Sequence, residues 1–387
     1  LVIQSHVIPL VTRSKKRSTE IVLKWPSTKL QQMIKRPYSP GVAKLQDVKT
    51  FPPKQFQGKY CLSPFVMIEV TIEGDVRMCG CGGWMPTTIG NLKETTLKEM
   101  LHSDLAQKIR QSIIDGSYVY CNEKLCGVIA NNSLNTINTV PANIRELFDD
   151  PAKFEMPHHI SFQGDETCNL SCPSCRTKII KTPKEQQAEQ LRIGELVSNN
   201  LFHQASDKKI KLQCSGSGEV FASPMLMNFI NSIDCSKFPN LELDIGTNGL
   251  MCEQNWHRLG DKHRAIKKLT VSIDASQAGT YEKVRRGGKW PKILESMKFL
   301  QSKKHELGFA LHTRIIVQQQ NYTQMESFYN LCQTFDVDTV EYSRVTNWGT
   351  WNFLEFNSQD VLNPVHPEYE LAQAELARVK KLSDTWF

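Results

Sequence analysis

Short apolar runs alternate with longer amphipathic stretches from residue 158 to residue 355. The runs have the length of strands, and the stretches between them have the length and the polar face of helices. Strands and helices that alternate in this way predict a parallel sheet with helices on its outside. The expected strands are 159–163, 209–214, 241–245, 268–273, 309–317 and 338–343, and the expected helices are 184–204, 223–233, 253–263, 290–305 and 321–335.

A different pattern precedes this region. Val66–Ile72 alternates like a half-buried strand, Glu73–Asp75 forms a turn, and Val76–Cys79 returns to complete a hairpin. A helix is expected from Thr95, which can act as its N-cap, to Ile113. Together these elements predict a small α+β domain.

Charge is distributed unevenly along the chain. Residues 1–55 hold eleven Lys or Arg against Glu20 and Asp47, a net charge of +9, whereas the whole chain carries +7. A basic segment can attract acidic partners. It lacks the interleaved aromatic residues of a single-strand binding surface, so a nucleic-acid partner is not expected. The expected parts are a basic extension at 1–55, a cysteine-rich α+β domain at 56–130, a linker at 131–157, the strand–helix region at 158–355 and a helical tail at 356–387.

Most of the twelve cysteines are grouped at short spacings, which is typical of metal sites in a reducing compartment rather than of secreted disulfide proteins. No apolar run approaches the length of a membrane span. The first residues lack the charged-then-apolar order of a signal peptide. We therefore expect a cytoplasmic protein with no membrane partner.

Three cysteines follow the first expected strand of the larger region, in Cys168-Asn-Leu-Ser-Cys172-Pro-Ser-Cys175. Three thiolates this close can hold a four-iron cluster and leave one iron without a protein ligand. A structural zinc site would need a fourth Cys or His, and none follows within ten residues of Cys175. A cluster is therefore favoured over a zinc knuckle.

The spacing Cys-x3-Cys-x2-Cys resembles the signature of the radical S-adenosylmethionine enzymes. The resemblance implies that Cys168, Cys172 and Cys175 hold a [4Fe-4S] cluster whose open iron binds the methionine part of S-adenosylmethionine. It implies a partial (β/α)6 barrel as the fold. It also implies reductive cleavage to a 5′-deoxyadenosyl radical, with electrons from a flavodoxin- or ferredoxin-type protein. The family usually has an aromatic residue before the third cysteine, where this chain has Ser174.

Motifs after the second and third strands extend this resemblance. Ser215-Gly-Ser-Gly-Glu219 resembles the Gly-Gly-Glu motif that holds the methionyl amino group, and Gly246-Thr-Asn-Gly249 resembles the family's Thr-Asn-Gly. Either motif alone is also explained by a plain turn. In a parallel barrel the carboxyl ends of the strands share one edge, where chemistry collects. The cofactor-binding residues implied here are Gly218, Glu219, Thr247 and Asn248.

The fourth and fifth strands continue the series. Val271-Ser-Ile-Asp274, followed by Tyr281–Gly288, resembles the segment whose serine and arginine bind the methionyl carboxylate and the ribose. A guanidinium suits a carboxylate because the two groups pair in bidentate fashion. The resemblance implies cofactor contacts from Ser272, Asp274 and Arg285, with Arg286 as the alternative arginine, and an adenine contact from Val317.

The amino-terminal cysteines form a second group. Cys61, Gly74 and Cys79 have the spacing of the first half of a SPASM or twitch module, and Ile89-Gly-Asn-Leu92 strengthens that resemblance. The module usually follows the barrel and carries seven cysteines, whereas here it precedes the barrel and has fewer. The resemblance therefore implies one auxiliary [4Fe-4S] cluster, with a zinc ribbon as the alternative. The expected ligands are Cys61, Cys79, Cys121 and Cys126, with Cys81 as the spare.

The family resemblance gives three hypotheses for function. SPASM-type enzymes mostly act on ribosomally made peptides by epimerisation, cross-linking or oxidation, so a peptide substrate is expected first. Epimerisation needs a hydrogen donor, and Cys214 at the end of the second strand is the candidate. The alternatives are a sugar or aminocyclitol dehydrogenase or epimerase, and a metal-binding scaffold without catalysis.

Overall fold

The computed structural model describes residues 56–382, apart from residues 124, 131, 151, 152, 155, 215 and 216. The expected basic extension therefore lies outside the described residues, as do the first two residues of the Ser-Gly-Ser-Gly-Glu motif. None of the described helices is long and apolar enough to cross a membrane.

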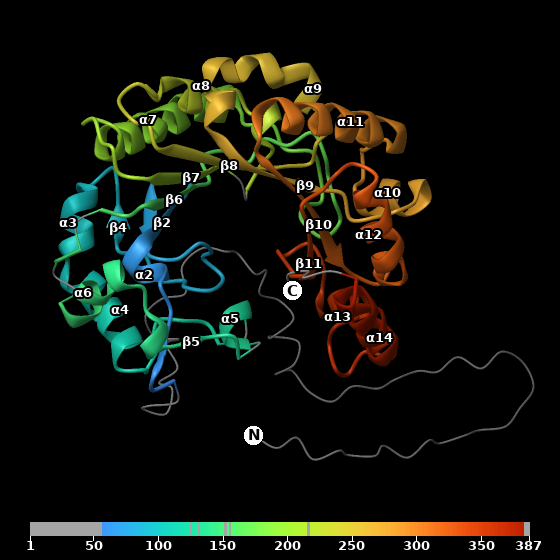
Figure 1. The fold of residues 1–387 in the computed structure, drawn as a ribbon, viewed down its shortest axis with the longest axis horizontal. Coiled ribbons are helices and arrows are strands. Elements are labelled where there is room, and N and C mark those ends of the chain that lie inside the picture. Colours follow the sequence, from blue (N-terminus) through green and yellow to red (C-terminus); the bar gives the residue numbers. More distant parts are fainter. Residues whose placement is uncertain are drawn as a thin grey trace, which may run out of the picture. The chain divides into compact units, whose positions relative to one another are not determined.

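A curved sheet of nine strands runs through the described part of the chain (Figure 1). Six of its strands are parallel and lie side by side in sequence order, as the alternating pattern predicts. Each begins and ends within two residues of its expected bounds. These strands are β6 (His159–Phe162), β7 (Ile210–Cys214), β8 (Leu241–Thr247), β9 (Ile266–Ser272), β10 (Ala310–Val317) and β11 (Thr339–Arg344).

Helices cover the convex face of these strands (Figure 1). The expected helix at 253–263 is instead a short α-helix followed by 3-10 turns, and Gly260 breaks it with a φ of 54°. A further short helix, α10, was not expected. The covering elements are α7 (Lys184–Leu201), α8 (Pro224–Ser232), α9 (Cys252–Asn255), η5 (Trp256–Ala265), α10 (Ala278–Val284), α11 (Trp290–Leu307), η6 (Tyr322–Gln324) and α12 (Met325–Gln333).

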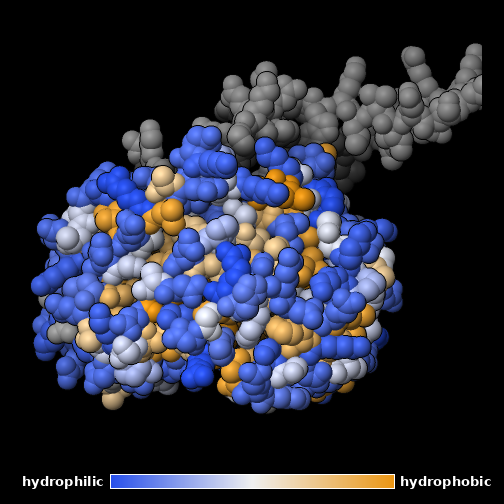
Figure 2. Space-filling model, turned by 90° about the horizontal axis from the view of Figure 1, so that it is seen from above, coloured by the Kyte–Doolittle hydropathy of each residue, from blue (hydrophilic) through white to orange (hydrophobic). Residues whose placement is uncertain are grey.

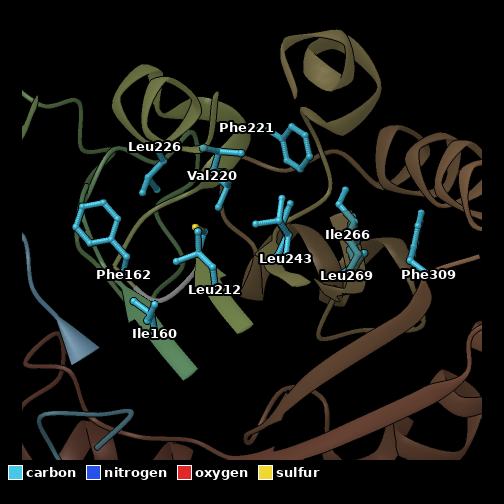
Figure 3. Packing of buried hydrophobic residues seen from close by; sticks show 14 of the residues in the cluster. Ile160, Phe162, Leu212, Val220, Phe221, Leu226, Leu243, Ile266, Leu269 and Phe309 are labelled. Carbon is cyan, nitrogen blue, oxygen red and sulfur yellow. The ribbon is translucent and has the colours of Figure 1, made fainter. Parts of the chain in front are cut away.

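Alternation along each strand separates two chemically different faces. Leu212 and Leu243 point toward Val220, Phe221 and Leu226 on the helix side (Figure 3). The residues between these apolar positions point to the concave, helix-free face, and most of them are polar. This face carries Ser161, Gln163, Lys211, Gln213, Asp244, Lys268, Thr270, Ser272, His312, Arg314 and Glu341.

The amino-terminal hairpin extends the same sheet. Strand β2 (Met67–Val70) pairs in parallel with β6, and β3 (Asp75–Arg77) and β4 (Gly90–Asn91) follow as antiparallel strands. The buried residues of both regions form one core cluster that includes Ile68 and Ile160. The cysteine-rich domain and the barrel are therefore continuous through the sheet and its core, rather than separate layers.

The helix expected from Thr95 to Ile113 is two helices. The first, α3 (Leu97–His102), is capped by Thr96, which exchanges hydrogen bonds with Glu99 in a capping box. Ser103 then caps α4 (Asp104–Ile114) by accepting from Ala106. The break arises because the Ser103 side chain competes locally for the backbone donors.

The expected linker at 131–157 is not a linker. Strand β5 (Asn135–Thr136) pairs with β1 (Lys59–Tyr60), and α6 (Ala142–Asp149) packs its apolar side into the domain. The segment contains several prolines, but the apolar residues between them are buried in a second core. The remaining small elements are α2 (Ser63–Val66), α5 (Gly127–Ala130) and η2 (Ile137–Thr139), and this core comprises Tyr60, Phe65, Ile113, Tyr118, Ile129, Leu134, Val140, Ile144 and Phe148.

Two helices end the described chain, α13 (Phe353–Gln359) and α14 (Tyr369–Lys380). One side of α14 is buried through Ala372, Leu376 and Val379. On the face seen in Figure 2, hydrophilic residues predominate and apolar residues form small groups between them. Single exposed apolar side chains are normal on a protein surface and are assigned no role.

Candidate active site

The three-cysteine loop follows β6 and is fixed by a buried carboxylate. Asp165 accepts hydrogen bonds from the Thr167 backbone at 2.9 Å, from the Thr182 hydroxyl at 2.5 Å and from the Ser223 hydroxyl at 2.5 Å. Within the loop, the Cys175 amide donates to the Cys172 carbonyl at 2.9 Å. The loop is therefore tied both to itself and to the start of α8.

Arg176 links this loop to the loop after β7. Its Nη2 donates to the Ser217 carbonyl at 2.6 Å, its Nη1 donates to the Glu166 carbonyl at 2.8 Å, and its Nε lies 3.4 Å from the sulfur of Cys175. Arg176 is not among the site residues expected from the sequence. Its position directly after the third cysteine was the available signal, because a cation there stabilises a neighbouring thiolate.

Position 218 needs a glycine because the backbone of the loop after β7 passes close to the backbone at Asp165 and Thr167. A Cβ at this position would lie 2.4 Å from the Asp165 carbonyl and 2.7 Å from the Thr167 carbonyl. The next amide, of Glu219, donates to Thr167 at 2.8 Å. The Gly-Glu segment thus packs directly against the entry to the cysteine loop, and only glycine fits there.

Glu219 connects the loop after β7 to the loop after β8 through hydrogen bonds. Its carboxylate accepts from the Thr247 hydroxyl at 2.6 Å, the Asn248 amide at 2.6 Å and the Phe221 amide at 3.2 Å. Burial raises the pKa of Glu219 and these hydrogen bonds oppose the rise. Because the residue is only 1% exposed, its side chain acts here as a brace between loops. Direct contact of Glu219 with a ligand stays a prediction.

Asn248 lies against the cysteine loop. Its Nδ2 donates to Asn169 at 2.8 Å and lies 3.9 Å from the sulfur of Cys168. Its Oδ1 accepts from the Leu250 amide at 3.1 Å. The structure therefore brings the motifs after β6, β7 and β8 together at one edge of the sheet.

Arg285 and Arg286 bind the same loop from the other side. Arg285 Nη2 lies 2.8 Å from Asp274, and its Nη1 lies 3.7 Å from the sulfur of Cys172. Burial lowers the pKa of Arg285, but Asp274 and Cys172 outweigh it and raise the pKa. Arg286 donates to the Ser171 hydroxyl at 3.1 Å. Of the two arginines, Arg285 is the one beside a cysteine sulfur.

The remaining expected residues divide between the two faces of the sheet. Ser272 is half-buried on the helix-free face, opposite Arg314 of β10. The Val317 side chain is fully buried on the helix side, and the expected adenine contact at Val317 stays a prediction. Alternation places Ile316, which is half-buried, on the helix-free face instead.

Cys214 is also on the wrong face for its expected role. It lies between Phe162 and Ile245 in the sheet register and is fully buried in the helix-side core. Burial raises the pKa of Cys214 to about 12. The prediction of a hydrogen donor at Cys214 is wrong, because its side chain packs as a small apolar group.

The amino-terminal cysteines meet in a second place. Four of them line one hollow. Burial raises the pKa of Cys79 to about 12, with a further contribution from Cys61. Among the described residues, no three His, Cys, Asp or Glu side chains are drawn together at single-ion spacing. The cysteines that line the hollow are Cys61, Cys79, Cys121 and Cys126.

Cys81, the expected spare, does not line this hollow. Burial raises the pKa of its thiol, and the charge of Glu69 adds to the rise. Glu69 is buried and pairs with Arg77 at 3.2 Å. It also accepts from Gln163, whose Oε1 accepts from Ser217 at 3.0 Å. A chain of polar contacts therefore leads from the amino-terminal domain to the loop after β7.

The donor sets fit iron–sulfur clusters at both places. Four sulfur donors that line one hollow suit a fully ligated cluster, and three sulfurs with neighbouring N–H donors suit a cluster with one open iron. Bound clusters supply one-electron chemistry. Around the three-cysteine loop, Arg176, Asn248 and Arg285 are the residues whose nitrogen atoms face sulfur.

Known proteins share these features. The family profile of the SPASM iron–sulfur cluster-binding domain matches residues 61–123. Curated relatives include GTP 3′,8-cyclases, one from Limosilactobacillus fermentum (24% identical over 53% of this chain and 59% of that protein) and one from Peptoclostridium acidaminophilum (24% identical over 56% and 66%). The chain thus spans less than two thirds of the length of these relatives.

Similar solved structures include SuiB of Streptococcus suis, with 14% identity, a TM-score of 0.37, and coverage of 63% of this chain and 52% of that one. Another is anSMEcpe with bound AdoMet, with 12% identity, a TM-score of 0.35, and coverage of 49% and 50%.

The three-cysteine loop, the ordered strand ends and the matched cluster domain agree on one family. In these features the chain is similar to the radical S-adenosylmethionine enzymes, and residues 61–123 match the SPASM cluster-binding domain. It carries its SPASM-type domain before the barrel, with the strands of that domain in the barrel sheet.

Proposed function

We propose that this radical S-adenosylmethionine enzyme cleaves S-adenosylmethionine reductively and abstracts a hydrogen atom from a peptide substrate. The observation that supports the cleavage step most strongly is the convergence of Glu219, Asn248 and Arg285 on the loop that bears Cys168 and Cys172. A flavodoxin- or ferredoxin-type protein is the proposed electron donor.

Each residue of the site has a distinct task in this proposal. Arg285, held by Asp274, presents a cation beside Cys172 and suits the methionyl carboxylate. Gly218 leaves room for close approach of the backbone, and Glu219 fixes that backbone against Thr247 and Asn248. The protein's contribution is to hold and orient the cofactor and to keep water from the reactive atoms.

The helix-free face of the sheet supports a peptide substrate. Asp244 bridges Lys211 at 3.0 Å and Lys268 at 3.2 Å, and Arg314 pairs with Glu341 at 2.6 Å. Donors and acceptors thus recur across several strands. An extended peptide needs such a series of partners for its backbone amides and carbonyls. The SPASM-type match points the same way by analogy only.

A second candidate is cyclisation of a nucleotide. The observation that favours it is the similarity to the GTP 3′,8-cyclases, whose name specifies GTP. GTP therefore belongs among the substrates to be assayed.

The test of cleavage uses the chain purified without oxygen and reduced with dithionite in the presence of S-adenosylmethionine. We expect about eight irons per chain, which corresponds to two four-iron clusters, together with formation of 5′-deoxyadenosine. Cys172→Ala abolishes deoxyadenosine formation, whereas Cys235→Ala, outside both cysteine groups, retains it. A full complement of iron without cleavage in the parent chain contradicts the proposal and favours a scaffold.

The substrate class is tested by stimulation of deoxyadenosine formation. The probes are a mixture of synthetic decapeptides, GTP, and an aminocyclitol. We expect stimulation by the peptides alone. Stimulation by GTP with a cyclised product supports the nucleotide candidate, and stimulation by the aminocyclitol supports a sugar-type dehydrogenase or epimerase. Either of these results overturns the peptide assignment and leaves the cleavage assignment intact.

A further inference from the structure

Tyr118 is one of the residues that line the hollow formed by the four amino-terminal cysteines. The residue is fully buried, and its hydroxyl has no hydrogen-bond partner among the residues that the structure describes. Buried polar groups in proteins are nearly always paired, so an unpaired phenol that borders a set of cluster ligands calls for a partner within the hollow.

The backbone holds Tyr118 in an uncommon conformation. Its φ is 49°, a region that residues other than glycine rarely adopt. Its amide donates to Ser112 at 2.9 Å, and its carbonyl accepts from the Cys121 amide at 2.9 Å. The ring of Phe56 packs edge-on at 5.0 Å. Strain of this kind persists where surrounding contacts fix the residue, and it concentrates at functional sites.

The hydroxyl is a donor rather than an anion, because a phenol with its ordinary pKa of about 10 is protonated near neutral pH. A protonated phenol has one O–H to donate, and within the described part of the chain no acceptor takes it.

We propose that Tyr118 donates a hydrogen bond to a sulfur atom of the auxiliary cluster held by Cys61, Cys79, Cys121 and Cys126, and thereby raises the reduction potential of that cluster. This inference rests on the proposed function, since it requires a cluster in the hollow. Reduction adds negative charge to the cluster, and a donated hydrogen bond stabilises the more negative state.

The test isolates the auxiliary cluster in a Cys172→Ala background, where the three-cysteine site is disabled. Tyr118→Phe is compared with Tyr60→Phe, which removes a phenol of the same core whose hydroxyl already bonds Thr139 at 3.0 Å. Iron and sulfide content and the midpoint potential from an EPR-monitored titration are measured.

We expect all three proteins to retain about four irons. In Tyr118→Phe we expect the equilibrium constant for one-electron reduction of the cluster to fall about tenfold, which lowers the midpoint potential by about 59 mV. In Tyr60→Phe we expect the midpoint potential to be unchanged. An unchanged potential in Tyr118→Phe overturns the inference. Absence of iron in the Cys172→Ala background instead overturns the auxiliary cluster itself, and the inference fails with it.

A second measurement covers the case in which Tyr118→Phe does not fold. Site-specific replacement of this tyrosine by 3-fluorotyrosine keeps its shape and makes the phenol a stronger donor. We expect the midpoint potential to rise, the opposite direction from Tyr118→Phe. No change in potential with the fluorinated residue contradicts the hydrogen bond to the cluster.

Discussion

Arg285 lies 2.8 Å from the carboxylate of Asp274, and the same guanidinium reaches to 3.7 Å from the sulfur of Cys172. Asp274 also accepts from the Ile316 amide at 2.7 Å and has a φ of 65°. The carboxylate at the end of β9 therefore determines where the cation lies relative to the cysteine loop. Asp and Asn tolerate this backbone conformation better than most residues do.

Asp274→Asn keeps the backbone conformation and removes the charge that holds Arg285. We expect a loss of about 3 kcal/mol of unfolding free energy, because one partner of a buried pair is removed. We also expect about a tenfold higher KM for S-adenosylmethionine, since Arg285 is no longer fixed. Denaturant unfolding and deoxyadenosine kinetics measure the two effects.

Asp360→Asn is the matched control for this prediction. Asp360 is a buried carboxylate paired with Arg344 at 2.5 Å, at the end of β11. Because the Arg344 side chain is half exposed, we expect Asp360→Asn to cost less stability than Asp274→Asn and to leave the KM for S-adenosylmethionine unchanged. Equal changes in KM for the two variants show that Asp274 has only a structural role.

Gly218→Ala tests the close approach of the loop after β7 to the cysteine loop. The added Cβ would lie 2.4 Å from the Asp165 carbonyl, so the backbone must shift. We expect a loss of about 1–3 kcal/mol and iron binding that is weakened at the three-cysteine site. Gly279→Ala in α10, where no atom lies within 4 Å of the added Cβ, leaves iron content unchanged. Equal iron content in both variants contradicts the prediction.

The buried pair Glu69–Arg77 links the SPASM-type domain to Gln163. Glu69→Gln leaves the Arg77 cation buried without its anion, so we expect a loss of about 3–5 kcal/mol. Joint replacement, Glu69→Leu with Arg77→Met, recovers most of this loss because no isolated charge remains. Guanidinium unfolding of the single and double variants measures the coupling. A double variant as unstable as Glu69→Gln contradicts this account.

The free energy of unfolding is expected to depend on pH through the carboxyl group of Glu341. Burial raises its pKa, but hydrogen bonds from His312 and Arg314 and the Arg314 charge outweigh it and lower the pKa from 4.5 to about 2. A lowered carboxyl pKa gives stability that is present above the unfolded pKa and lost as the pH falls through the folded pKa. Its stabilising contribution is therefore lost between about pH 4.5 and about pH 2.

Glu341→Gln checks this assignment. We expect it to cost about 1–2 kcal/mol near neutral pH, a value reduced from the full shift because Arg314 is partly exposed. The difference from the parent chain vanishes near pH 2. Glu375→Gln, whose partner Arg378 is at the surface, costs less than about 0.5 kcal/mol. A difference for Glu341→Gln that is independent of pH rules out the ion pair as its cause.

Replacement of Cys81 and replacement of Cys121 are expected to differ in how much iron the auxiliary site retains. Cys121 lines the hollow, whereas Cys81 lies beside the Glu69–Arg77 pair. In a Cys172→Ala background we expect Cys121→Ser to lose most of the iron and Cys81→Ser to keep it. Iron and sulfide analysis after anaerobic purification measures this. Loss of iron in Cys81→Ser makes Cys81 a ligand.

The sequence by itself predicted the six parallel strands within two residues, because alternation of apolar and polar side chains reflects burial directly. The four cysteines expected as auxiliary ligands line one hollow, and their role as ligands stays a prediction. The spacing of residues along the chain does not show which face of the sheet a side chain at a strand end occupies. Cys214 and Val317 end strands at the expected positions, but their side chains point to the helices.

Other features depended on contacts between distant segments. The pairing of β2 with β6 and the packing of α6 into the amino-terminal core arise from surfaces that meet only after folding. The same is true of Arg176, whose partners come from separate loops. Sequence alone determined the periodicity, the strand-end motifs and the donor chemistry, because these are local. The tertiary structure alone decided which face each side chain occupies and which loops it joins, because register and packing are set by the whole sheet.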